Sequence, residues 1–138
     1  MSQTKLYIGC GLTHASDFTS QVEELKLQLR KDYEVFEFLG LEKGSAADVY
    51  HWDIETCVAG CDLFVAICDF ASIGLGYEIA AAALAYKKPV LAVAQSDALV
   101  TRLILGARVP NFSFARYNHM SDIPKLIQAK LETISKNY

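Results

Sequence analysis

The chain lacks the long apolar segments that a membrane protein needs. None of its apolar runs approaches the roughly 20 residues of a transmembrane helix, and its start does not resemble a signal peptide. Its formal net charge of -3 provides no overall positive field for a nucleic acid polymer. We therefore expect a cytoplasmic protein that binds neither a membrane nor a nucleic acid polymer.

Several familiar site motifs are also missing. The sequence contains no Gly-Lys-Ser or Gly-Lys-Thr of a Walker loop and no Gly-x-Ser-x-Gly of a serine hydrolase. The pair Gly9 and Gly11 lacks the third glycine of a dinucleotide-binding fingerprint. Cys57 and Cys61 are either two ligands of one metal or reduced, buried thiols, and no Cys-x-x-Cys pair or histidine cluster completes a zinc site. We expect no metal and no cofactor.

The residues that are present suit a single folded domain over 1–138. They are 52% hydrophobic and 21% charged, with no linker, repeat or low-complexity tract. Apolar patterns predict strands at 5–9, 33–38, 62–68, 89–94 and 112–115, and helices at 16–31, 48–59, 78–86, 97–106 and 123–135. Alternating strands and helices, with nearly continuous apolar strands, predict an α/β fold: a Rossmann-like three-layer sandwich with a mainly parallel sheet of four or five strands.

The most informative segment is 72–78, which follows the apolar strand 62–68. Its two glycines, Gly74 and Gly76, predict a loop whose backbone N–H groups come close to an anionic ligand. Glu78 follows in the first turn of the predicted helix, where it either complements the helix dipole or points into a ligand crevice as a nucleophile or acid/base. Tyr7, at the end of the first strand, either holds such a carboxylate or packs in the core.

These residues resemble a known family. The run 7–11, an acidic residue near 53, Asp62 and the run 74–78 are similar to the nucleoside 2-deoxyribosyltransferase superfamily, and most of all to its 2′-deoxynucleoside 5′-monophosphate N-hydrolases. The resemblance extends from residue 5 to about 107. It is strong over 62–78 and loose elsewhere.

The resemblance implies a mechanism. Glu78 would attack the anomeric carbon of the sugar and form a glycosyl ester, as in retaining glycosidases. Tyr7 would orient Glu78 by a hydrogen bond. Asp53 would contact the base and protonate it as it leaves.

The aspartate near the base departs from the family pattern. The family places it eight residues before the strand aspartate, where this chain has Ile54, so that Asp53 and Glu55 are each displaced by one residue. One residue is about a hundred degrees of rotation on a helix. An extra residue near 59–60 would restore Asp53, the assignment we favour, and the alternative is that both acids are surface charges.

Ser72 separates two branches of the family. Transferases typically have an aspartate there, which accepts a hydrogen bond from a free 5′-hydroxyl, whereas a serine can donate to a 5′-phosphate. The alternative is a simple turn residue. Thr101 matches a position from which a neighbouring subunit reaches the phosphate. The hydrolases' first-loop arginine is absent, and Thr13, His14 and Ser16 are the candidates to replace it.

The sequence therefore predicts an N-glycosidase that converts a (2′-deoxy)nucleoside 5′-monophosphate to free base and sugar 5-phosphate without a cofactor. Gly9, Gly11, Gly74 and Gly76 are expected to line the substrate, together with Ser72 and Thr101. The resemblance also implies a homodimer or a higher homo-oligomer with shared active sites. The alternatives are a deoxyribosyltransferase that exchanges bases and a nucleotide-binding sensor without turnover.

Overall fold

The computed structural model describes residues 3–11, 16–40 and 42–136. Its five strands form one sheet in the order β2-β1-β3-β4-β5, and every neighbouring pair is parallel. The strands are β1 (Lys5–Cys10), β2 (Glu34–Phe36), β3 (Leu63–Ile67), β4 (Val90–Gln95) and β5 (Phe112–Tyr117). The predicted α/β sandwich is confirmed, with a sheet that is parallel throughout.

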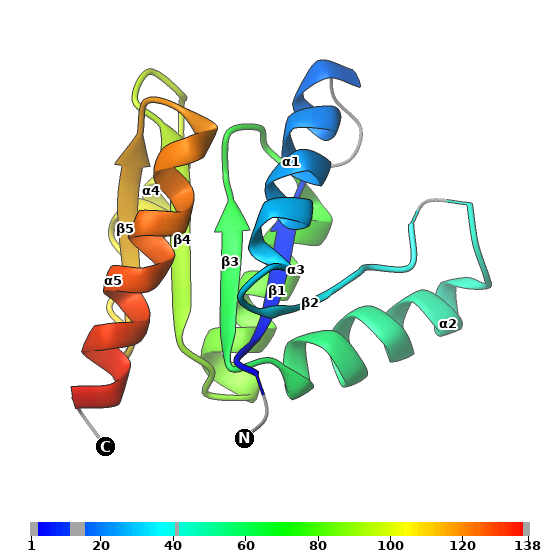
Figure 1. Ribbon diagram of the computed structural model, residues 1–138. Helices are drawn as coiled ribbons and strands as arrows, with labels where there is room; N and C mark the ends of the chain where they lie inside the picture. Colours follow the sequence, from blue (N-terminus) through cyan, green and yellow to red (C-terminus); the bar gives the residue numbers. More distant parts are fainter. Residues whose placement is uncertain (1–2, 12–15, 41, 137–138) are drawn as a thin grey trace.

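Helices cover both faces of the sheet. They are α1 (Ser16–Leu29), α2 (Ala46–Tyr50), the π-helix η1 (His51–Val58), α3 (Ile73–Ala80), the π-helix η2 (Ala81–Ala85), α4 (Arg102–Leu105), the short 3₁₀ helix η3 (Met120–Asp122) and α5 (Ile123–Lys136). Figure 1 shows α1 and α5 on one face and α3 on the other. Within the described ranges, no helix has both the length and the apolar content needed to cross a bilayer.

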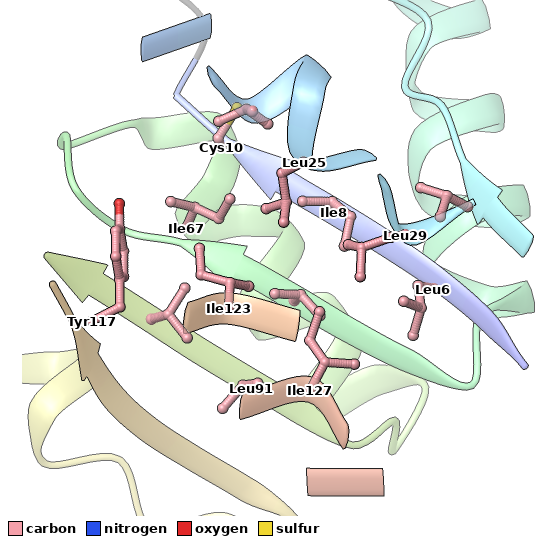
Figure 2. Packing of buried hydrophobic residues seen from close by; sticks show 14 of the residues in the cluster. Leu6, Ile8, Cys10, Leu25, Leu29, Ile67, Leu91, Tyr117, Ile123 and Ile127 are labelled. Atoms are coloured by element: carbon pink, nitrogen blue, oxygen red, sulfur yellow. The ribbon is translucent and has the colours of Figure 1, made fainter. Parts of the chain in front are cut away.

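Each face of the sheet has its own core. Because side chains alternate along a strand, β1 sends Leu6 and Ile8 to one core and Tyr7 to the other. Figure 2 shows the first core, in which residues of α1 and α5 pack against the strands. The second core joins η1 and α3 to the opposite face. All five residues of β3 are buried, as the continuous apolar run predicted.

The strand order locates the ligand-binding edge. The chain runs from β1 to β2 on one side and then returns to place β3 on the other side of β1. In open α/β sheets, ligands bind beyond the carboxyl ends of the strands at such a reversal, here between β1 and β3. The residues that end β1 and the connection from β3 to α3 therefore border the expected site.

Two predicted boundaries were wrong. Helix α3 begins at Ile73 rather than at 78, because Ser72 caps it: the Ser72 hydroxyl oxygen accepts a hydrogen bond from the Leu75 N–H at 3.2 Å. Both glycines of the expected loop are therefore helical. The helix predicted at 97–106 is shorter and begins only after Thr101, whose side chain accepts from the Leu103 N–H.

Candidate active site

Tyr7 and Glu78 meet at the reversal between β1 and β3. The Tyr7 hydroxyl donates a hydrogen bond to Glu78 Oε2 at 2.6 Å. The Tyr7 ring is fully buried and stacks on Phe64, with 5.4 Å between the ring centroids. Both alternatives for Tyr7 are thus correct, because its ring belongs to the core while its hydroxyl holds the carboxylate.

The surroundings of Glu78 raise the pKa of its carboxyl. Burial raises its pKa to about 7, against the opposing effect of the Tyr7 hydrogen bond. The charge of Asp53 raises the same pKa further, and Lys26 lowers it. Burial, together with the neighbouring Glu78 charge, also raises the pKa of Tyr7, so the phenol stays a donor. Among the described residues none donates to Glu78 Oε1, which leaves that oxygen for a ligand.

Asp53 reaches the same region from η1. Its Oδ1 accepts a hydrogen bond from the Leu39 N–H at 2.9 Å, and its charge raises the pKa values of both Tyr7 and Glu78. Burial raises the pKa of Asp53 itself. Glu55, by contrast, is exposed and lies 3.5 Å from His51 Nδ1.

The π-helix explains how the displaced Asp53 reaches this place. The Ala59 N–H donates to the Ile54 carbonyl five residues earlier, which is the wide turn of a π-helix. Such a turn accommodates one more residue than an α-helical turn. These wide turns lie just before residues 59–60, where the extra residue was expected.

The expected phosphate contacts are only partly available. The Gly76 N–H donates to the Ser72 carbonyl at 3.1 Å inside the helix, so the prediction that it binds an anion was wrong. The Gly74 N–H lies in the first turn of α3, where helix geometry provides no intrahelical acceptor. Ser72 uses an oxygen lone pair for its cap, and its hydroxyl hydrogen remains free to donate.

A hollow of about 570 Å³ lies beside the Tyr7–Glu78 pair rather than around it. Ser72, Gly76 and Thr101 line it together with apolar side chains, whereas neither Tyr7 nor Glu78 does. Asp53 does not line the hollow either, so both candidate carboxylates lie outside it. Ser72 and Thr101 thus border the same hollow within a single chain, whereas Thr101 was expected to reach the phosphate from a neighbouring subunit.

Gly9, the glycine of β1, has a packing role. A Cβ on Gly9 would lie 2.9 Å from Phe64 Cζ and 3.0 Å from Leu75 Cδ1, so the bare backbone permits α3 to approach the sheet. Gly11 is buried directly after β1. Of the proposed replacements for the arginine, Thr13 and His14 lie outside the described residues.

The four cysteines are free and buried. Burial raises the pKa values of Cys57 and Cys61 to about 12 each, so both are thiols near neutral pH. In the part of the chain that the structure describes, no three histidine, cysteine, aspartate or glutamate residues are placed to hold a metal ion.

Lys26 is a buried charge near the site that the sequence did not lead us to expect. Its side chain is 0% exposed, and its ammonium contacts Glu23 at 3.2 Å and Glu37 at 3.3 Å. The spacing of Val22, Leu25 and Leu29 carried a signal, since Lys26 falls on the same helical face.

Comparison with known proteins gives structural matches only. No protein-family model matches the sequence, and no curated protein matches it significantly. A CMP N-glycosidase from Clostridium botulinum is 23% identical, with a TM-score of 0.68, over 91% of this chain and 99% of that one. A 2-deoxyribosyltransferase from Leishmania mexicana is 18% identical, with a TM-score of 0.55, over 84% of this chain and 85% of that one.

A third structure limits what these matches mean. The lysine decarboxylase of Francisella novicida is 16% identical, with a TM-score of 0.55, and the match covers 96% of this chain but only 17% of that one. At such identities a likeness establishes the fold alone. The fold expected from the family resemblance is confirmed, and proteins with different activities share it.

Proposed function

We propose that the protein is an N-glycosidase that hydrolyses a nucleoside 5′-monophosphate, with 2′-deoxyribose as the sugar, to free base and sugar 5-phosphate. The observation that carries the proposal is the Tyr7–Glu78 pair: a half-buried carboxylate of α3 with one oxygen held by a tyrosine of β1 and the other open. The fold shared with an N-glycosidase and a deoxyribosyltransferase supports it. No cofactor is required.

In the proposed mechanism, ionised Glu78 attacks the anomeric carbon through Oε1 while Tyr7 holds Oε2. The C–N bond breaks, its electron pair moves to the base nitrogen, and Asp53 donates a proton to the base. The product of this step is a glycosyl ester of Glu78 and a neutral base. Asp53 then accepts a proton from water, which attacks the same carbon and regenerates the Glu78 carboxylate.

The pKa values suit these two roles. Burial raises the pKa of Asp53, which favours the protonated form that a general acid needs. Glu78, with a pKa of about 7, is ionised in a substantial fraction of molecules at neutral pH. Its weak solvation makes the carboxylate a better nucleophile than a fully hydrated one.

The start of α3 supports a substrate with a 5′-phosphate. The Ser72 hydroxyl and the Gly74 N–H lie at a helix N-terminus, where the helix dipole favours a negative group. We place the phosphate there, with Gly9 and Gly11 along the sugar and Thr101 at the edge of the phosphate site. Gly76 contributes the absence of a side chain rather than a hydrogen bond.

Base release measured by chromatography tests the proposal. The purified protein is incubated with each deoxynucleoside and its 5′-monophosphate, with and without a second free base. We expect release from monophosphates without an acceptor base, and a loss of at least roughly a thousandfold in Glu78→Ala. The matched control is Glu55→Ala, which removes an exposed glutamate and should keep full activity.

Other outcomes select a different function. Release that requires an acceptor base would indicate a deoxyribosyltransferase, the activity named for the Leishmania structure. Nucleotide binding without release, unchanged in Glu78→Ala, would indicate a sensor. Full activity in Glu78→Ala would contradict the proposed nucleophile.

We further propose that the chain assembles as a homodimer or a higher homo-oligomer. Ile73, Leu99 and Leu103 are 96%, 96% and 83% exposed and border the apolar hollow of about 570 Å³. Projecting side chains and a hollow on one face allow two copies to fit reciprocally. A purified protein that sediments only as a monomer at micromolar concentration would contradict this assembly.

A further inference from the structure

The segment 37–39, directly after β2, is held from two sides. On one side, the Glu37 carboxylate contacts Lys26 of α1 and Arg30, which directly follows that helix. On the other, the Glu37 carbonyl accepts a hydrogen bond from Trp52 Nε1 of η1 at 2.6 Å. Glu37 thus joins α1 to η1 across the end of β2.

The same segment fixes the carboxylate of Asp53. The Leu39 N–H, two residues after Glu37, donates to Asp53 Oδ1 at 2.9 Å. Asp53 also follows Trp52 directly in η1, so the residue before it is linked to the same segment by the Trp52 side chain. A displacement of Glu37 would therefore change the orientation of the Asp53 carboxyl.

Lys26 is an unusual choice for its location if stability alone mattered. It is 0% exposed, with its ammonium 4.1 Å from the centre of the Phe38 ring and in contact with two half-exposed glutamates. A methionine would fill a similar volume without the cost of burying a charge, and such replacements of buried ion pairs are often neutral or stabilising. A lysine here instead fixes the positions of Glu37 and Phe38.

We propose that Lys26 is a positioning residue for proton donation: by fixing Glu37 and Phe38, it holds the 37–39 segment so that the Leu39 N–H aims Asp53 at the leaving base. This inference rests on the proposed function for its catalytic part. Lys26 itself touches neither the base nor the sugar in this scheme. Apart from its charge, which lowers the pKa of Glu78, its effect on the reaction passes through the segment to Asp53.

The test uses Lys26→Met and two readouts. Trp52 is the sole tryptophan, so its fluorescence reports the hydrogen bond to the Glu37 carbonyl. Base release is measured for the nucleotide that the wild type cleaves fastest and for its cationic N-methylated derivative, whose base leaves without a proton. We expect a shifted Trp52 emission, a loss of at least roughly tenfold on the neutral base, and less than about a threefold loss on the cationic base.

Two further variants keep the test decisive. Lys130→Met is the matched control, since it removes a half-buried lysine that donates to the Asn111 carbonyl, and it should change neither readout. If Lys26→Met does not fold, Glu37→Gln tests the same link, because the amide keeps the size of the side chain and loses its charge. Circular dichroism verifies the fold of each variant.

The outcomes separate this inference from the proposed function. Equal losses on both substrates, or a selective loss with an unchanged Trp52 emission, would overturn the role of Lys26. Unchanged emission together with unchanged rates would do the same. A wild type that releases no base would overturn the proposed function and the catalytic part of this inference, while the Trp52 emission would still decide whether Lys26 holds the segment.

Discussion

Two tyrosine–carboxylate pairs link the sheet to its surroundings, one in each half. Tyr7, in the middle of β1, donates to Glu78 of α3 at 2.6 Å, and Tyr117, at the end of β5, donates to Asp69 beyond β3 at 2.7 Å. Both tyrosines are buried. The second oxygen of Asp69 accepts from the Gln95 N–H at 3.3 Å, whereas that of Glu78 has no donor among the described residues.

The difference shows how one arrangement serves structure or chemistry. Burial raises the pKa of Asp69, but two hydrogen bonds and the charge of Arg116 oppose the rise. At Glu78 only the Tyr7 hydrogen bond and the charge of Lys26 oppose it, and the pKa reaches about 7. A carboxylate with both oxygens occupied ties strands together, while one with a free oxygen retains the capacity to react.

The largest expected effect is the pH dependence of the free energy of unfolding, which the carboxyl of Glu78 should dominate. The pKa of Glu78 rises from 4.5 in the unfolded chain to about 7 in the folded protein. Between these pH values, Glu78 is ionised in the unfolded chain and still protonated in the folded one, so the free energy of unfolding falls by up to about 3 kcal/mol. Glu78→Gln escapes this loss, so its stability relative to wild type should increase by that amount from pH 4 to pH 8. Urea unfolding at both pH values measures it.

Asp69→Asn should show the opposite sign at neutral pH. An amide offers one acceptor oxygen, so the Tyr117 hydroxyl or the Gln95 N–H loses its partner, at a cost of about 1–3 kcal/mol. Base release should stay within a fewfold of wild type. If Glu78→Gln loses stability at pH 8 as Asp69→Asn does, the two pairs are equivalent and the contrast between them is wrong.

A smaller effect is expected from removing each hydroxyl. Tyr7→Phe takes away the hydrogen bond that lowers the Glu78 pKa, which should therefore rise above 7 by about one pH unit. Carbon NMR of labelled glutamate measures this titration. Tyr117→Phe is the matched variant and should leave the Glu78 titration unchanged while costing about 1 kcal/mol of stability. An unshifted Glu78 pKa in Tyr7→Phe would contradict the assigned role of the hydrogen bond.

The sequence was informative where the relevant pattern is local. The apolar runs at 62–68 and 89–94 predicted buried parallel strands, because continuous burial leaves its mark in consecutive residues. Glu78 could be proposed because it lies in the helix that follows such a run, and Tyr7 because it lies in the first predicted strand. The link between Tyr117 and Asp69 had no comparable signal, since no glycine-containing motif marks either residue and only the assembled sheet brings them together.

Three errors or omissions have physical causes. Gly74 and Gly76 suggested a loop, yet the Ser72 cap and the burial of Leu75 outweigh the helix-breaking tendency of two glycines. The reach of Asp53 depends on a π-helix, which a period of 3.6 residues does not describe. Lys26 lay hidden because a charged residue on an apolar helical face is ordinarily assigned to the surface.

The smallest expected effect concerns Gly76, which lies in α3, the helix that carries Glu78. A Cβ at Gly76 would meet no atom within 4 Å, and an alanine in a helix is roughly 0.5–1 kcal/mol more favourable than a glycine. Gly76→Ala should therefore raise the free energy of unfolding by about that amount, as thermal unfolding can measure. If a nucleotide or a second copy approaches the bare backbone there, the more stable variant should bind or assemble more weakly. Gly9→Ala, whose Cβ would lie 2.9 Å from Phe64, should lose stability instead, and a gain there would contradict the packing role of that glycine.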